Sequence, residues 1–123
     1  MITDAELGER QRVERLFTEE EKLALRGLML SNTSFDRVDF SGADLAHAVF
    51  RNVSLVGADF RGARLTLATF FCCDMRDTQF DRSTLLRGSR FDFSDLSGAR
   101  GLPGPGKALI RRAGGIFPVF SLR

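Results

Sequence analysis

Large apolar residues recur at every fifth position through the middle of the chain. They are Leu30, Phe35, Phe40, Leu45, Phe50, Leu55, Phe60, Leu65, Phe70, Met75, Phe80 and Leu85. The residue two positions before each of them is small or medium in size, and the other three positions are mostly polar. A helix repeats its faces every 3.6 residues and a strand every 2, so a period of five fits neither straight element. It fits a chain that turns a corner after each short extended side, because residues two apart in an extended backbone share a face.

The identities of these residues predict how many sides make one coil. Phe recurs at 40, 60 and 80, and Leu recurs at 45, 65 and 85. A spacing of twenty residues corresponds to four sides of five, with like residues stacked on like. The remaining two columns would hold Leu30, Phe50 and Phe70, and Phe35, Leu55 and Met75. Such stacking fills a narrow interior without gaps.

The five-residue unit resembles the repeat of the pentapeptide-repeat family, as in Ala43-Asp44-Leu45-Ala46-His47 and Ala58-Asp59-Phe60-Arg61-Gly62. The resemblance implies an all-β solenoid, a right-handed quadrilateral β-helix. From the number of repeats we expect about three and a half coils, with an N-terminal α-helical cap and a C-terminal tail.

The regular count fails once, near the C-terminal end of the repeats. It resumes one residue late at Phe91 and continues to Leu96. This predicts a one-residue bulge near residues 86–88. Phe91 and Leu96 therefore complete a predicted core of fourteen residues, stacked above Phe70 and Met75.

The segments on either side of the repeats differ from them. In residues 1–27, capping-box patterns at Thr3–Glu6 and Thr18–Glu21 predict a helix over about 4–16 and a short helix that Gly27 ends, or one long kinked helix. This segment would cover the first coil, with Leu16, Phe17, Leu23 and Leu25 against Leu30 and Phe35, or it would bind a partner. Residues 28–100 form the predicted solenoid. Residues 101–123 form a Gly/Pro turn and an apolar tail for capping or dimerisation.

Charge and composition exclude several classes of function. The chain has 123 residues and a formal net charge of +2, and residues 31–100 carry nine Asp and nine Arg. A balance of this kind does not favour binding to nucleic acid or to a membrane. No stretch approaches the roughly 20 apolar residues of a membrane span, and the N-terminus has no apolar signal core. We therefore expect a cytoplasmic protein.

Candidate catalytic and ligand-binding residues are few. Cys72 and Cys73 point to opposite sides in this register, so no disulfide between them is expected, and His47 has no second ligand at metal-binding spacing. The stretch from Gly101 to Ala108 has the spacing of a phosphate loop, but Ala108 replaces the Ser or Thr that binds Mg²⁺. The stacked pairs Asp39/Asp59 and Asp74/Asp95 are interpreted as solvated surface. The sequence predicts no enzyme, no metal and no cofactor.

One outer face is less polar than the others. Around the Phe50 column it carries Val49, Thr69, Phe71, Cys72 and Phe93, with Leu67 at the adjoining corner, and the tail adds Phe117 and Phe120. Exposed apolar patches tend to mark contacts. Either a terminal segment folds over this face, or it binds a partner or a second copy of the chain.

These observations favour a non-catalytic protein–protein interaction or scaffold module, whose partner the sequence does not identify. The family resemblance implies an alternative, a DNA mimic that binds type II topoisomerase (DNA gyrase) and confers quinolone protection. The neutral repeat region and the short solenoid depart from that pattern. A homodimer through the C-terminal tail or the open end of the solenoid is a further possibility, because such an end is an unpaired strand edge.

Overall fold

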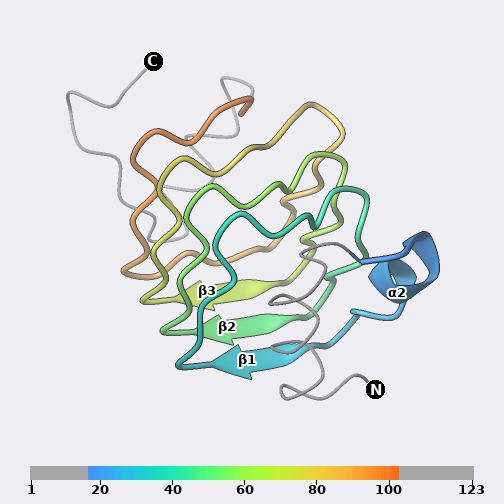
Figure 1. Ribbon diagram of the computed structural model, residues 1–123, viewed down its shortest axis with the longest axis horizontal. Helices are drawn as coiled ribbons and strands as arrows, with labels where there is room; N and C mark the ends of the chain where they lie inside the picture. The colour runs from blue at the N-terminus through green and yellow to red at the C-terminus, as the bar shows by residue number, and fades with distance from the viewer. Residues whose placement is uncertain (1–16, 103–123) are drawn as a thin grey trace.

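The computed structural model describes residues 17–102 as a stack of similar coils (Figure 1). Helix α2 spans Glu19–Leu23, and three short strands follow: β1 at Met29–Ser31, β2 at Val49–Arg51 and β3 at Thr69–Phe71. The strands form one parallel sheet in the order β1-β2-β3. Its register joins Leu30 to Phe50 and Phe50 to Phe70, so that residues twenty apart lie side by side.

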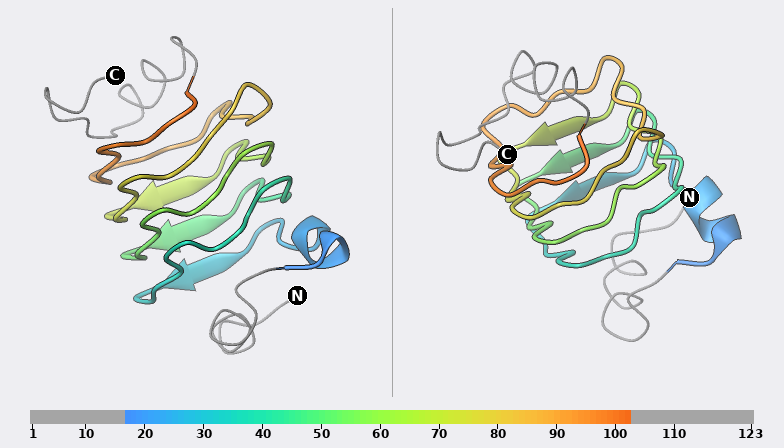
Figure 2. Two further views of the ribbon diagram at one scale, coloured as in Figure 1. Left: turned by 45° about the horizontal axis from the view of Figure 1, so that its top comes forward. Right: turned by 90° about the horizontal axis from the view of Figure 1, so that it is seen from above.

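Isolated parallel bridges hold the other sides of each coil together. Each bridge joins neighbouring coils: Ser34 to Ser54, Ser54 to Asp74 and Asp74 to Asp95; Asp39 to Asp59, Asp59 to Gln79 and Gln79 to Arg100; and Asp44 to Arg64 and Arg64 to Leu85. With the sheet, these bridges give each coil four sides, as the spacing of twenty residues predicts (Figure 2).

The four sides are named here in chain order. Side A carries the sheet and continues at residues 90–92. Side B comprises residues 33–36, 53–56, 73–76 and 94–97, and side C comprises 38–41, 58–61, 78–81 and 99–102. Side D comprises 43–46, 63–66 and 84–87.

The interior consists of columns of stacked side chains. Every residue of the predicted core except Leu85 is buried. The Phe60 ring stacks between Phe40 and Phe80, with centroids 5.6 and 5.7 Å away. In the neighbouring column the Phe70 ring lies 4.8 Å from Phe50 and 5.0 Å from Phe91. Because one backbone path is repeated at each coil, the rings within a column are nearly parallel.

Leu85 is the exception, and its predicted place in the core is wrong. Its side chain is 49 % exposed, whereas Leu86 packs against the core. Leu85 bridges Arg64, so the extra residue lies between Phe80 and Thr84 and not near residues 86–88. Thr84 is buried there, and its hydroxyl donates a hydrogen bond to the Phe60 carbonyl at 2.9 Å. Two consecutive leucines made both registers compatible with the apolar pattern.

Helix α2 begins with the predicted capping box. The Glu21 N–H donates to the Thr18 hydroxyl at 3.1 Å, and the Thr18 N–H donates to the Glu21 carboxylate at 3.0 Å. The helix ends at Leu23 with Ala24 as its C-cap, before the predicted end at Gly27. The predicted helix over 4–16, including Leu16, lies outside the described residues.

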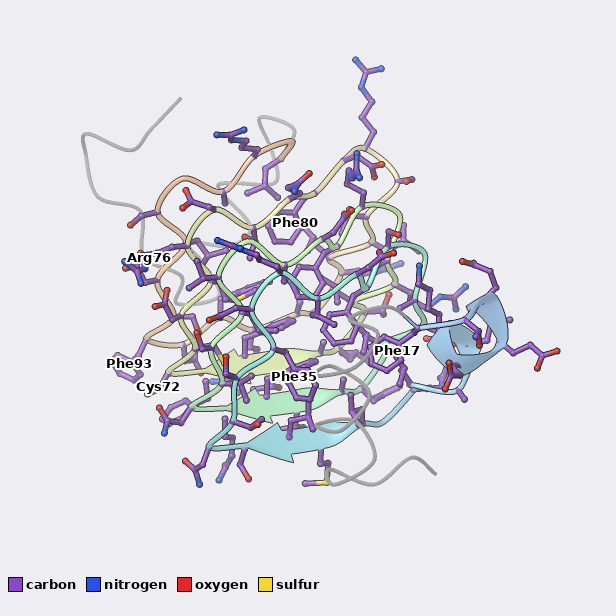
Figure 3. The ribbon with its side chains drawn as sticks, in the orientation of Figure 1. Phe17, Phe35, Cys72, Arg76, Phe80 and Phe93 are labelled. Carbon is purple, nitrogen blue, oxygen red and sulfur yellow. The ribbon has the colours of Figure 1, made fainter. Side chains whose placement is uncertain are left out.

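The side chains next to α2 contact the first coil differently from the prediction. Phe17, which is labelled in Figure 3, stacks on Phe40 with ring centroids 5.6 Å apart. Leu25 is buried. Leu23 is exposed, so its predicted contact with the first coil is wrong. Phe17 thus extends the Phe40 column beyond the repeats.

Lys22 makes a contact that the sequence analysis missed. This residue is buried, and its Nζ lies 3.3 Å from Asp39 Oδ2 and 3.2 Å from Ser41 Oγ. Partial burial by itself raises the pKa of the Asp39 carboxyl, but hydrogen bonds from Ser41 and the charge of Lys22 outweigh burial, so the pKa is lower than its ordinary value. Lys22 therefore joins α2 to side C through a charge-assisted contact.

The two cysteines are free and differ in environment. Cys72 is exposed and Cys73 is buried. The Cys73 thiol donates to the Phe50 carbonyl, with 3.3 Å between sulfur and oxygen. Burial raises the pKa of the Cys73 thiol to about 11.

Within residues 17–102, no helix is both long enough and apolar enough to cross a bilayer.

The position of the extra residue can be tested with a matched pair of substitutions. We expect Leu86→Ala to lower the free energy of unfolding by about 2 kcal/mol, because it leaves a cavity in the core. Leu85→Ala should change it by less than about 0.5 kcal/mol, as exposed positions usually do. Urea denaturation followed by circular dichroism measures both values. A larger loss of stability for Leu85→Ala than for Leu86→Ala would mean that Leu85, and not Leu86, is the core residue.

Alkylation tests the assignment of the cysteines, because the thiolate is the reactive form of cysteine. Iodoacetamide at pH 8 should add one group to the native chain, at Cys72, and two groups after denaturation, as measured by mass spectrometry. The variant Cys72→Ser should remain unmodified while folded. Equal labelling rates at the two native cysteines would contradict the assignment.

Candidate interaction surface

Six apolar side chains form a surface that extends over side A, its two corners and the adjoining side D, and this surface is called the apolar surface. Its members are Met29, Val49, Leu67, Phe71, Leu85 and Phe93. Phe93 is 70 % exposed, Met29 67 % and Leu67 52 %. Figure 3 shows Phe93 and Cys72 together at one end of the sheet, far from α2.

The structure places the predicted surface residues as follows. Leu67, Phe71, Cys72 and Phe93 are exposed, and Val49 and Thr69 are half-buried. Phe117 and Phe120, which were also predicted to contribute, lie outside the described residues. Met29 and Leu85 also belong to the surface, although neither was predicted to do so. Met29 could have been predicted, because it directly precedes the inward residue Leu30 and so points outward. Leu85 could be predicted to point outward only if the extra residue had been placed before Thr84.

Two phenylalanines and one arginine form the centre of the apolar surface on side A. The Phe71 and Phe93 rings meet edge to face, with centroids 5.9 Å apart and an interplanar angle of 90°. The guanidinium carbon of Arg51 lies 5.9 Å from the centroid of the Phe71 ring. Edge-to-face pairs and cation–π contacts of this kind hold exposed rings in defined orientations. The centre therefore presents a fixed aromatic shape to the solvent.

Two members of the apolar surface stand at corners with a left-handed backbone. The φ angle is +60° at Leu67 and +57° at Phe93. Equivalent corners hold Gly27, His47 and Gly88 in the first case and Asn32, Asn52 and Cys72 in the second. Glycine and asparagine adopt this conformation readily, whereas a bulky residue loses about 1–2 kcal/mol there. Because both side chains are largely exposed, burial does not offset that cost.

The glycine at the corner above Leu67 leaves room for its side chain. A Cβ atom added at Gly88 would lie 2.7 Å from Leu67 Cδ2, which is closer than real Cβ contacts. The Leu67 side chain therefore lies across the next coil and stays over the corner between sides D and A.

A groove of about 480 Å³ borders the aromatic centre on side B. It is lined by Asn32, Thr33, Ser34, Asn52, Val53, Ser54, Cys72 and Asp74. The Asn52 amide donates to Asn32 Oδ1 at 2.9 Å, which joins two corners of consecutive coils. Side B is thus polar up to the corner at which Phe93 stands.

Three surface carboxylates, those of Asp59, Asp74 and Asp92, each form an ion pair within their own coil. Arg61 donates to Asp59 at 2.8 Å and Arg76 to Asp74 at 2.9 Å, each two residues along the same side. The stacked aspartates of the sequence analysis are indeed bridge partners. An arginine pairs with one aspartate of each stack, Arg61 with Asp59 and Arg76 with Asp74. No group of three or more potential metal ligands occurs among residues 17–102. Within the described residues, these carboxylates therefore form ion pairs and hydrogen bonds on the surface and do not come together in a metal site.

Comparisons with solved structures give several similar chains. A trypsin-treated form of QnrB1, a plasmid-mediated fluoroquinolone resistance protein, is 19 % identical over 68 % of this chain and 54 % of its own, with a TM-score of 0.46. A pentapeptide repeat protein from the thylakoid lumen of Arabidopsis thaliana is 21 % identical over 66 % and 59 %, with a TM-score of 0.37. HetL, involved in heterocyst differentiation regulation in the cyanobacterium Nostoc sp. strain PCC 7120, is 24 % identical over 77 % and 49 %, with a TM-score of 0.40.

The chain spans about half to three fifths of the length of these three proteins. A comparison with curated proteins gives no match. The family model of pentapeptide repeats matches eight copies, over residues 25–55 and 48–85. These are the residues whose inward side chains build the columns of the solenoid, and the chain belongs to the pentapeptide-repeat family.

Proposed function

We propose that this protein is a non-catalytic interaction module that binds a protein partner through the apolar surface. The observation that carries the proposal is the exposure of Leu67 and Phe93 at left-handed corners. The left-handed backbone at both residues lowers the stability of the fold, and the burial of their side chains offsets little of that loss. Strained residues of this kind persist where function requires them.

The composition of the surface fits a binding role. Aromatic residues and arginine are enriched where protein interfaces gain most of their binding energy. Phe71, Phe93 and Arg51 form such a group, and their mutual contacts hold them in place. Because the coil beneath is tied to its neighbours by backbone hydrogen bonds, little ordering entropy would be lost on binding. A rigid solenoid therefore suits recognition by shape.

The surrounding segments complete the proposal. Residues 1–27 would cap the first coil, supported by Phe17 on Phe40 and by the Lys22 contact with Asp39. Residues 28–100 would form a right-handed solenoid of about three and a half coils. Residues 101–123 would cap the last coil or support dimerisation. The exposed free thiol of Cys72 supports a reducing compartment such as the cytoplasm.

Corner substitutions test the proposal, because they separate binding from folding. Phe93→Asn and Leu67→Asn introduce a residue that tolerates a left-handed backbone. We expect each to leave the free energy of unfolding unchanged or to raise it by up to about 1 kcal/mol. Each should weaken binding of the partner, captured on the immobilised full chain and identified by mass spectrometry, by at least about tenfold.

The control for this experiment is Leu23→Asn, the same exchange at an exposed leucine on α2. It should retain the partner at full affinity. If the corner variants keep the partner, the apolar surface is not the binding site. If they unfold, Leu67 and Phe93 stabilise the fold, and the observation that carries the proposal fails.

The DNA-mimic alternative fits the described surface less well. A mimic needs an array of unpaired carboxylates, whereas Asp59, Asp74 and Asp92 are each bonded to an arginine. We expect no change in DNA supercoiling by gyrase, or in its inhibition by a quinolone, at micromolar concentrations of the full chain. Inhibition of supercoiling or protection from the drug in a gel assay would favour the mimic instead.

A further inference from the structure

We infer that the partner segment that binds the apolar surface is acidic, with Asp or Glu side chains arranged around an apolar anchor. This inference rests on the proposed function and concerns the chemistry of the partner. It follows from the charges that remain without a counter-ion on sides A and D.

The carboxylates on these two sides already have partners within the chain. On side A, Asp92 accepts a hydrogen bond from Arg90 at 2.7 Å. On side D, Asp44 accepts from the Ala46 N–H at 3.1 Å and lies 3.8 Å from Arg26. The remaining outward positions of both sides, in the part of the chain that the structure describes, carry no acidic residue. The acidic residues of α2 lie beside the first coil (Figure 1).

Three arginines on the same two sides are exposed and form no ion pair within residues 17–102. They are Arg51, Arg64 and Arg87. Arg51 is the bridge partner of Phe71 on side A. Arg64 is the bridge partner of Leu85 on side D. The uncommitted positive charges are therefore distributed among the members of the apolar surface.

Leu67 connects the two sides. Its N–H donates to the Arg87 carbonyl at 2.9 Å, and it occupies the corner at which side D turns into side A. The apolar residues therefore run around this corner from Leu85 to Phe71 and Phe93, with Arg64 and Arg87 towards one end and Arg51 towards the other. A bound segment that covers Leu67 can reach cations on both sides.

An apolar surface with exposed cations among and beside its members selects a partner by charge. Complementary rim charges steer the encounter and suppress partners of the wrong sign, in a salt-dependent manner. The C-terminal residues 103–123 of this chain carry Lys107, Arg111, Arg112 and Arg123 and no acid, so they match this surface poorly. An acidic amphipathic segment of another protein matches both its shape and its charge.

Two synthetic peptides test the inference. Each has about 16 residues with the same Leu and Phe positions at helical spacing, one with Glu and one with Lys at the polar positions. Fluorescence anisotropy measures their binding to the full chain at low and physiological salt. We expect the Glu peptide to bind at least about tenfold more tightly than the Lys peptide, with the difference shrinking as salt rises.

Substitutions on the apolar surface test whether the Glu peptide binds there. Arg51→Glu and Arg87→Glu should each weaken binding of the Glu peptide about tenfold, and Phe93→Asn should abolish it. The matched control is Arg37→Glu, because Arg37 is exposed, makes no ion pair within the described residues and stands at the corner between sides B and C. That variant should bind the Glu peptide as the unchanged protein does.

The outcomes separate this inference from the proposed function. Equal binding of both peptides, with sensitivity to Phe93→Asn, overturns the acidic partner and leaves the interaction surface in place. Binding that is unaffected by the three substitutions on the apolar surface, or no binding, also overturns the inference, and the captured partner then decides the proposed function separately. If light scattering shows a dimer that Phe93→Asn dissociates, the occupant is a second copy of the chain and the inference is wrong.

Discussion

Backbone hydrogen bonds between successive coils determine nearly everything else in this structure. The Phe40 N–H donates to the Asp59 carbonyl at 2.8 Å, and the Phe60 N–H donates to the Gln79 carbonyl at 2.8 Å, so the path of one coil is copied by the next. Because the path is copied, side chains stack on their equivalents and corners stand above corners. The interior columns and the surface strain are thus two results of the same repeated backbone.

This constraint explains which features were predictable. The phenylalanine columns followed from the spacing alone, since each inward position has a single environment repeated at every coil. Leu85 did not, because Leu86 fits the apolar pattern equally well and only Thr84, with its buried hydroxyl, distinguishes the two registers. The burial of Lys22 was not predictable either, because it depends on where Asp39 and Ser41 lie relative to a segment outside the repeats.

The candidate surface was predictable in part, and for a different reason. Outward positions carry no constraint from stacking, so an apolar residue such as Phe71 or Phe93 stands out in the register. The pairing of charges depends on side-chain geometry that the register does not define. Only the folded chain shows that Asp92 pairs with Arg90. Only the folded chain shows that Arg51 has no carboxylate partner within the described residues.

The extra residue between Phe80 and Thr84 has a consequence for how such a chain can change in length. Coils before it repeat after twenty residues and the next repeat after twenty-one, yet Asp59 and Gln79, Arg64 and Leu85, and Gln79 and Arg100 all remain bridged. The added length is absorbed at one corner, and the phase of every later side is restored. The corner between sides C and D is therefore a place at which the protein could accept an inserted loop without any change in how its coils stack.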